Sequence, residues 1–105
     1  MRILIVGASG YIGGRLASLL GARGHDLVLM SRDARPLAAR FPDARVVAAD
    51  LLDPPTLAPA LGGVDIAYYL AHSMGGGERG FAERDLQAAR TFAQAAAVAG
   101  VSRIV

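Results

Sequence analysis

The chain has no cysteine and no long apolar run, and both absences limit what it can be. Without cysteine it has neither a disulfide framework nor a thiolate metal site. No apolar run approaches the roughly 18 residues that a membrane-spanning helix needs. The run at residues 3–6 follows Arg2 directly but is too short for a secretion signal. We therefore expect a cytoplasmic protein without a membrane partner.

Lysine is also absent, so the slight excess of 11 basic over 9 acidic residues consists of arginine alone. The arginines are spread along the chain and form no basic block, which argues against a nucleic-acid partner. The two histidines, His25 and His72, lie far apart without an acidic cluster, so we expect no metal site.

The apolar residues that are present make up short runs separated by segments with helical spacing. The 105 residues suffice for one domain, and a hydrophobic content of 53% provides a core. Unalternating apolar runs are typical of strands that are buried on both faces of a parallel sheet. These runs predict strands at residues 3–6, 27–30, 46–49, 66–70 and 104–105.

The segments between the runs predict four helices. The first contains Ile12, Leu16, Leu19 and Leu20, and a short second one ends at Pro42. The third begins at Pro54 and Pro55, with Asp53 as its N-cap, and ends at residues 62–63. The fourth covers residues 81–99, and we expect its sheet-facing side to consist of Leu86, Ala89, Phe92, Ala93, Ala96 and Ala97.

Strands that alternate with helices predict an α/β fold, a Rossmann-type doubly wound parallel sheet. Residues 1–105 are expected to be the N-terminal part of one nucleotide-binding domain. Val105 lies inside the last apolar run, with no turn or polar tail after it. We interpret this as a chain cut within a larger domain, so that the sheet is incomplete at its C-terminal end. The alternative is a short terminal strand.

Residues 3–15, ILIVGASGYIGGR, combine a strand, a glycine-rich turn and the start of a helix. Gly7 lets the chain turn out of the strand, Gly10 leaves room for a pyrophosphate, and Gly13 lets the helix pack closely on the sheet. Phosphates then bind N–H groups at the positive end of the helix dipole. The alternative is an ordinary turn with incidental glycines, but the surrounding β/α units favour a cofactor site. This site is predicted to include Gly7, Ser9, Gly10, Tyr11, Ile12 and Gly13.

The GxxGxxG spacing of this turn resembles the extended and atypical short-chain dehydrogenase/reductase families, which include NmrA-like and nucleotide-sugar epimerase-like proteins. The resemblance extends over the whole chain. Residues 68–74, YYLAHSM, are similar to an atypical branch of NAD(P)H-binding proteins. The resemblance implies a dinucleotide cofactor and leaves the reaction and the small-molecule substrate open.

The end of the second predicted strand bears on the choice of cofactor. NAD-specific Rossmann proteins usually place an acidic residue there, whereas this chain has Ser31 followed by Arg32. A hydroxyl and a guanidinium suit a 2′-phosphate, so we favour NADP(H) and keep NAD(H) as the alternative. Asp33 complicates the prediction, because its carboxylate would repel a phosphate if it faced the site. In the structural alternative, Arg32 is a solvated residue paired with Asp33.

Two further segments are assigned to the cofactor by the resemblance. Asp50 matches the position that meets the adenine, with Leu51 lining the ring pocket; the alternative is a helix-cap or turn aspartate. Leu70 and Ala71 match backbone contacts to the cofactor ribose, and His72 follows them toward the nicotinamide or substrate. Neighbouring His and Ser residues rarely align as base and nucleophile, so we expect a cofactor contact rather than catalysis at His72.

The missing lysine limits the reaction that this chain can carry by itself. Short-chain reductases normally use a Tyr-xxx-Lys pair, and no such pair lies in this chain. The leading hypothesis is the cofactor domain of an oxidoreductase or epimerase whose catalytic residues lie beyond Val105. The alternative is a non-catalytic NADP(H)-sensing regulator of the NmrA-like type.

Overall fold

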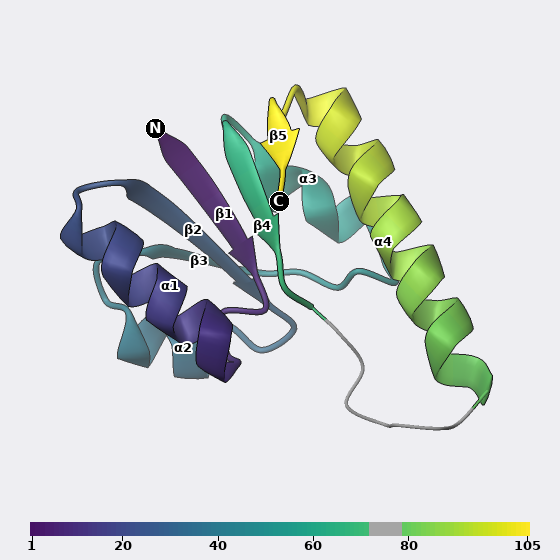
Figure 1. Ribbon diagram of the computed structural model, residues 1–105, viewed down its shortest axis with the longest axis horizontal. Helices are drawn as coiled ribbons and strands as arrows, with labels where there is room; N and C mark the ends of the chain where they lie inside the picture. The colour runs from purple at the N-terminus through teal and green to yellow at the C-terminus, as the bar shows by residue number, and fades with distance from the viewer. Residues whose placement is uncertain (72–78) are drawn as a thin grey trace.

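The computed structural model describes residues 1–71 and 79–105, in which parallel strands alternate with helices (Figure 1). The strands are β1 (Arg2–Val6), β2 (Asp26–Ser31), β3 (Arg45–Ala48), β4 (Ile66–Tyr69) and β5 (Arg103–Ile104). The helices are α1 (Tyr11–Ala22), α2 (Arg35–Arg40), α3 (Leu57–Leu61) and α4 (Arg79–Ala99), and the 3₁₀ turn η1 (Pro54–Thr56) precedes α3. The predicted alternation and the α/β class are confirmed.

All neighbouring strands of the sheet are parallel, in the order β3-β2-β1-β4-β5. The chain starts at the central strand β1, moves outward to β3, and then crosses back to β4 on the other side of β1. Ile5 lies beside Leu29 of β2 and Tyr68 of β4. The predicted doubly wound sheet is therefore confirmed, and its strand order reverses between β1 and β4.

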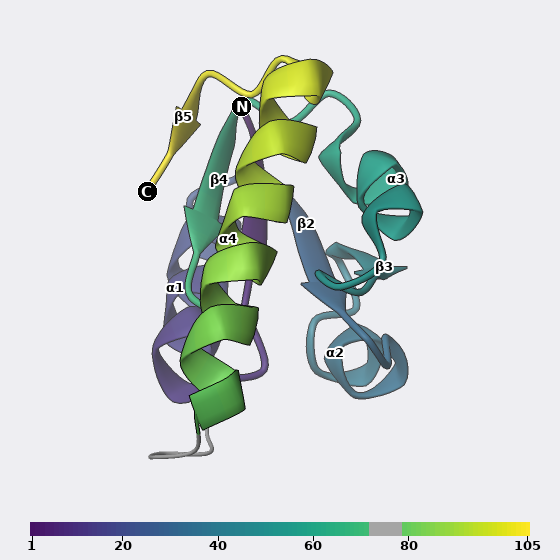
Figure 2. The ribbon, with the colours of Figure 1, turned by 90° about the vertical axis from the view of Figure 1, so that its right-hand side faces the viewer.

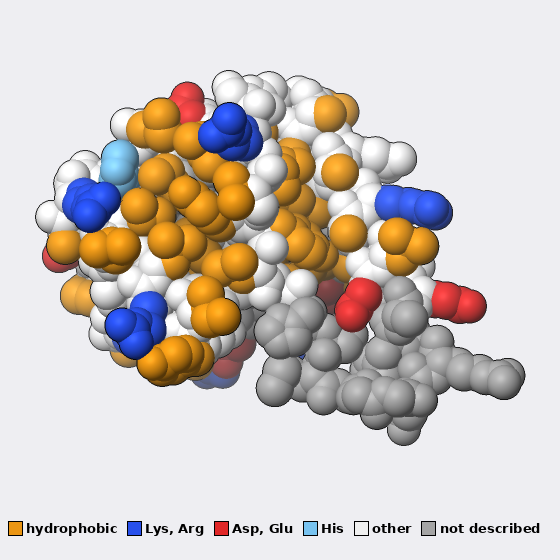
Figure 3. All heavy atoms as spheres, in the orientation of Figure 1, with side chains coloured by type: hydrophobic (Ala, Val, Ile, Leu, Met, Phe, Trp, Pro, Cys, Tyr) orange, Lys and Arg blue, Asp and Glu red, His pale blue; other side chains and the backbone are white. Residues whose placement is uncertain are grey.

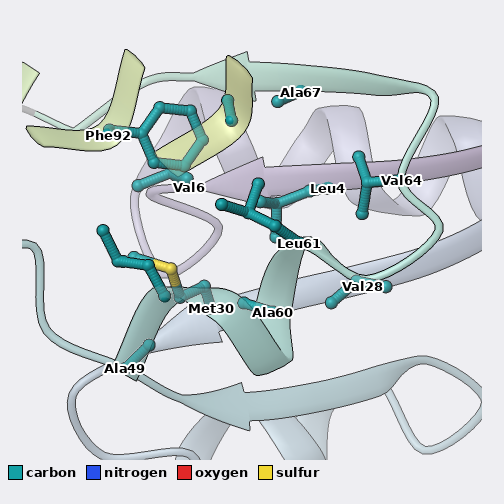
Figure 4. Close-up of a cluster of buried hydrophobic side chains, with 12 residues drawn as sticks. Leu4, Val6, Val28, Met30, Ala49, Ala60, Leu61, Val64, Ala67 and Phe92 are labelled. Atoms are coloured by element: carbon teal, nitrogen blue, oxygen red, sulfur yellow. The ribbon is translucent and has the colours of Figure 1, made fainter. Parts of the chain in front are cut away.

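Helices cover the sheet on both faces, α1 and α2 on one and α3 and α4 on the other (Figures 1 and 2). Along β1, Ile3 and Ile5 join the core beneath α1 and α2, whereas Leu4 and Val6 join the core beneath α3 and α4. Figure 4 shows the second core, where Phe92 of α4 and Leu61 of α3 lie over the strands. Burial on both faces explains why the strands read as continuous apolar runs.

The packing of α4 differs from the face that its sequence predicts. Ala88, Phe92 and Ala96 form its buried stripe, with spacings of four residues. Leu86 is 53% exposed, and Ala93 and Ala97 are exposed as well, so their assignment to the sheet-facing side is wrong. The alanines of this helix give no sharp apolar stripe, and only the large Phe92 ring sets its rotation against the core.

The start of the third helix also differs in detail. Residues 54–56 form the 3₁₀ turn η1, and the α-helical turns begin only at Leu57. Asp53 occupies the N-cap position of η1, as predicted, but its side chain makes no capping hydrogen bond. The hydroxyl of Thr56 holds this segment instead, because it donates to the carbonyl oxygen of Asp53 at 2.7 Å.

Side chains of different kinds are distributed unevenly over the surface. Figure 3 shows hydrophobic side chains gathered over α1 and the adjoining part of the sheet. On the same face the basic side chains stand apart from one another (Figure 3). Among the helices of residues 1–71 and 79–105, none has both the length and the apolar character required to cross a bilayer.

Candidate functional site

A cleft of about 580 Å³ lies at the carboxyl ends of the strands, where the order reverses between β1 and β4. Open parallel sheets bind their ligands at this position. The segments after β1, β2, β3 and β4 all contribute to its walls, and α4 closes one side. The predicted cofactor residues that line the cleft are Gly7, Ser9, Gly10, Ser31, Arg32, Asp50, Leu51, Leu70 and Ala71.

The turn between β1 and α1 begins at Gly7, whose backbone has a φ of +96°. This left-handed conformation strongly favours glycine. The turn is closed by the N–H of Gly10, which donates to the carbonyl oxygen of Gly7 at 3.1 Å. A Cβ built at Gly7 would also lie 2.9 Å from the carbonyl carbon of Leu70. Gly7 therefore allows both the sharp turn predicted for it and the close approach of the segment after β4.

Gly13 is buried under the turn rather than in the wall of the cleft. A Cβ built there would lie 2.2 Å from the carbonyl oxygen of Gly7. The close approach predicted at Gly13 is therefore present, but the partner is the backbone of the turn at the end of β1. The missing side chain lets the first turn of α1 pack against its own entry loop.

Gly10 differs from the other two glycines of the motif. Its backbone is extended, with φ −77° and ψ 170°, which any residue can adopt. A Cβ built at Gly10 meets only the Gly7 carbonyl oxygen, at 3.4 Å. Neither backbone strain nor a severe clash within the described chain requires glycine here. The open space in front of Gly10 fits a ligand that approaches the backbone closely.

The N-terminus of α1 is open toward this space. Gly10 occupies the N-cap position and has no side chain to cap the helix, and the first turn contains no acidic residue. The first N–H groups of an α-helix have no partner within the helix. Together with the helix dipole, they make this end attractive to an anion such as a phosphate.

Tyr11 and Ile12 are not brought into the cleft. They are 76% and 70% exposed, and neither lines its wall. The Tyr11 hydroxyl accepts a hydrogen bond of 2.8 Å from Nη1 of Arg15, and the Arg15 guanidinium lies 5.5 Å from the centre of the Tyr11 ring. Both residues stand on the first turn of α1, outside the wall that the strand ends form.

At the end of β2, Ser31 is half-buried and Arg32 is exposed, and both line the cleft. Asp33 does not pair with Arg32. Its Oδ1 accepts from Nε of Arg35 at 3.0 Å and from the Arg35 backbone N–H at 3.1 Å, and its Oδ2 accepts from Nη2 at 3.0 Å. These bonds to Arg35 lower the pKa of the Asp33 carboxyl. The structural alternative of an Arg32–Asp33 pair is therefore wrong.

Asp50 borders the cleft after β3 and also shapes the loop there. Its Oδ1 accepts a hydrogen bond from the backbone N–H of Leu52 at 2.9 Å. The Asp50 backbone N–H donates to the hydroxyl of Thr56 at 2.8 Å. Asp50 is thus a turn aspartate, the alternative considered for it, and at the same time part of the cleft wall. Half-buried Leu51 lines the cleft beside it.

The segment after β4 is held against the glycine turn. The backbone N–H of Leu70 donates to the carbonyl oxygen of Val6 at 2.9 Å, which extends the β1–β4 ladder to the rim of the cleft. Leu70 and Ala71 are half-buried and line the cleft. His72 lies outside the described residues.

Sequence reasoning did not include the wall formed by α4 and by Tyr69. The cleft is also lined by Tyr69, Arg84, Asp85 and Ala88. Burial raises the pKa of the Tyr69 phenol, and the charge of Asp85 raises it further. The Tyr69 ring centre lies 5.2 Å from that of Phe92. The signal that would have found α4 is the spacing of four residues that leads from Ala96 through Phe92 and Ala88 to residue 84.

Comparisons with known proteins agree with this geometry. Residues 7–105 match the model of a family described as NAD(P)H-binding. A 3-diazoavenalumate denitrifying reductase from a Streptomyces species is 50% identical over 54 residues, which are 50% of this chain and 16% of that protein. A 3-beta-hydroxysteroid dehydrogenase from Mycolicibacterium neoaurum is 33% identical over 70 residues, which are 67% of this chain and 19% of that protein. The chain spans less than a fifth of the length of either relative.

A solved structure shows the same architecture. The dTDP-glucose 4,6-dehydratase DesIV from Streptomyces venezuelae, crystallised with NAD bound, superposes with a TM-score of 0.82 and 28% identity. The match covers 99% of this chain and 38% of that one. The resemblance to extended short-chain dehydrogenase/reductase proteins, predicted from the glycine motif, is therefore confirmed for the fold of the whole chain.

Proposed function

The chain belongs to the NAD(P)H-binding family, and from this premise we propose that residues 1–105 are the cofactor domain of a short-chain-type oxidoreductase or epimerase. The observation that carries the proposal is the cleft at the β1–β4 reversal, which joins the glycine turn to the ends of β2, β3 and β4. One extended ligand in this cleft can contact all four segments. A dinucleotide has that extended form.

The pyrophosphate is assigned to the β1–α1 turn. Gly10 presents backbone without a side chain, and the uncapped N-terminus of α1 adds a favourable dipole. Ser9 lines the same part of the cleft and offers a hydroxyl donor. Tyr11 and Ile12 are assigned to the pyrophosphate site only through their backbone N–H groups, which belong to the first turn of α1. Their exposed side chains are assigned no contact.

The adenosine half is assigned to the ends of β2 and β3. Asp50 supplies an acceptor for an exocyclic amine, and Leu51 provides apolar surface for the base. NADP(H) is favoured over NAD(H) because Arg32 borders the cleft and has no hydrogen bond or ion pair among the described residues. The competing carboxylate of Asp33 is bound by Arg35.

The nicotinamide half is assigned to the segment after β4, beginning with Leu70 and Ala71 and continuing to His72. When bound, the nicotinamide ring supplies or accepts the hydride. The residues of this chain hold the cofactor through backbone and side-chain contacts. Because the chain contains no lysine, the proposal assigns no Tyr-xxx-Lys proton relay to it.

Gly10 provides the central test, because a substitution there can separate binding from folding. Aspartate is a favourable N-cap residue, so Gly10→Asp should keep the free energy of unfolding within about 1 kcal/mol of wild type. The same carboxylate occupies the space assigned to the pyrophosphate and repels it. Fluorescence titration of the purified protein should show NADPH and NADH bound by wild type and weakened at least about 100-fold in Gly10→Asp.

Gly10→Asn is the matched control, because asparagine caps a helix equally well without the charge. It should lose less affinity than Gly10→Asp. Undiminished binding of both dinucleotides by the folded Gly10→Asp variant would overturn the assignment of the pyrophosphate to this turn.

A second candidate is a non-catalytic NADP(H)-sensing regulator of the NmrA-like type, which the same cleft supports because a sensor also needs a dinucleotide site. The two candidates differ in turnover. An oxidoreductase consumes NADPH when supplied with a suitable member of a panel of carbonyl substrates. A sensor binds NADPH and NADP⁺ with different affinities and leaves the nicotinamide unchanged over the same panel.

A further inference from the structure

Helix α4 contributes the charged residues Arg84 and Asp85 to the cleft wall, and its other side is packed into the core. Phe92 and Ala96 are each 1% exposed, and Ala88 continues their stripe to the rim. Arg84 stands one turn before Ala88 on the same side of the helix and lines the cleft. The position of Arg84 is therefore set by a helix packed into the core, not by a surface loop.

The described arginines differ in whether they have a partner and in whether they line the cleft. Several have a partner: Arg2 pairs with Asp26, Arg35 with Asp33, Arg15 donates to Tyr11, and Arg40 lies over the ring of Phe41. Arg84, like Arg32, lines the cleft and has no hydrogen bond or ion pair with any described residue.

The carboxylate of the next residue, Asp85, does not explain why Arg84 lies in the cleft wall. Asp85 also lines the cleft, but adjacent residues of a helix do not face each other, so Asp85 is poorly placed to neutralise Arg84. Across the cleft, the charge of Asp85 helps to raise the pKa of the Tyr69 phenol. A guanidinium without a protein partner at the wall of a cleft is suited to a phosphate, which it can bind through two parallel hydrogen bonds.

We propose that Arg84 is a second cationic ligand of the bound dinucleotide, which reaches one of its phosphate groups from the α4 wall, opposite the glycine turn. This inference rests on the proposed cofactor function. Together with Arg32 it gives the cleft two cations on different elements, one after β2 and one on α4. Both the pyrophosphate and a 2′-phosphate offer the required chemistry, and a comparison of NADH with NADPH distinguishes them.

The test is a titration of NADPH and NADH against wild type, Arg84→Gln and Arg84→Lys of the purified protein. Glutamine is a good helix former, so Arg84→Gln should leave α4 intact while removing the charge. We expect the Kd to rise about tenfold in Arg84→Gln. Arg84→Lys should recover part of the affinity, because it keeps the charge and loses the bidentate geometry.

Arg90→Gln is the matched control, because Arg90 is an exposed arginine of the same helix that does not line the cleft. It should change neither Kd by more than about twofold. A loss confined to NADPH identifies the 2′-phosphate as the group that Arg84 contacts, and an equal loss for both cofactors identifies the pyrophosphate.

If Arg84→Gln binds both cofactors as tightly as Arg90→Gln, the inference is wrong while the proposed function stands. If wild type binds neither cofactor, the proposed function fails and the role of Arg84 fails with it. Circular dichroism of each variant shows whether α4 remains folded, so that a loss of binding is not mistaken for a loss of structure.

Discussion

The β1–α1 turn and the connection from β2 to α2 both border the cleft, but they do so with different parts of the chain. In the turn, Gly7 and Gly10 present backbone, and the nearest atoms around Gly7 and Gly13 are backbone atoms of the protein itself. In the connection, Ser31 and Arg32 present side chains, and the Arg32 side chain is exposed.

The difference separates two tasks. Backbone cannot be exchanged by mutation, and the glycines that shape it leave little tolerance, so the turn is suited to groups that every dinucleotide shares. Exposed side chains can be exchanged with little effect on the fold. Under the proposed function, the turn decides whether a dinucleotide binds and the connection decides which one.

The largest effect is expected at Gly13. In Gly13→Ala the new methyl group would lie 2.2 Å from the Gly7 carbonyl oxygen, and that atom belongs to backbone. The turn or the helix must shift, which should lower the free energy of unfolding by about 3 kcal/mol. Urea denaturation followed by circular dichroism measures this change.

Gly62→Ala serves as the control for that experiment. Gly62 follows α3, has a φ of −58°, and a Cβ built there meets no atom within 4 Å. Its stability should stay within about 0.5 kcal/mol of wild type. If Gly13→Ala is equally stable, the turn is softer than its backbone contacts indicate, and the contrast between the two regions fails.

A smaller effect, on binding alone, is expected at Arg32. Arg32→Ala removes the exposed guanidinium at the end of β2 and should weaken NADPH binding about tenfold, because a charge-assisted hydrogen bond to the 2′-phosphate is lost. NADH binding should change by less than about twofold. Parallel titrations with the two cofactors test this, and equal losses for both would contradict the assignment of the 2′-phosphate to Arg32.

The smallest effect is expected at Asp33. Its carboxylate is bound by Arg35 and does not line the cleft, so Asp33→Asn should change the Kd of NADPH by less than about twofold. The measurement is the titration used for Arg32→Ala. A marked tightening of NADPH binding would mean that the Asp33 carboxylate opposes the phosphate, and the connection would then not select NADP(H) as proposed.

Much of the fold could be predicted because its signals are local. Apolar runs of four to six residues, such as residues 3–6, mark strands buried on both faces, and glycine and proline mark most helix ends. The side of α4 that faces the core could not be read correctly. Alanines on every side of a helix give no direction, and the exposed Leu86 resembles a core residue in sequence.

The candidate site could be predicted in part for a related reason. The segments after each parallel strand meet at one edge of the sheet, which places Ser31 beside the cofactor, and the family resemblance assigned Asp50 and Leu70 to the same site. The partner of Asp33 could not be predicted, because Arg32 and Arg35 both lie within two positions of it in sequence. The turn into α2 brings the backbone and guanidinium of Arg35 to both carboxylate oxygens.

By itself, the sequence determined the order of strands and helices, the doubly wound class and the glycine turn after β1. These follow from hydrophobic periodicity and from residues whose backbone preferences act over a few positions. Only the tertiary structure decided that Arg84 of α4 shares a cleft with Arg32, 52 positions earlier in the chain. The rotation of α4 depends on how Phe92 packs over the sheet, and such a contact between distant segments leaves no local pattern.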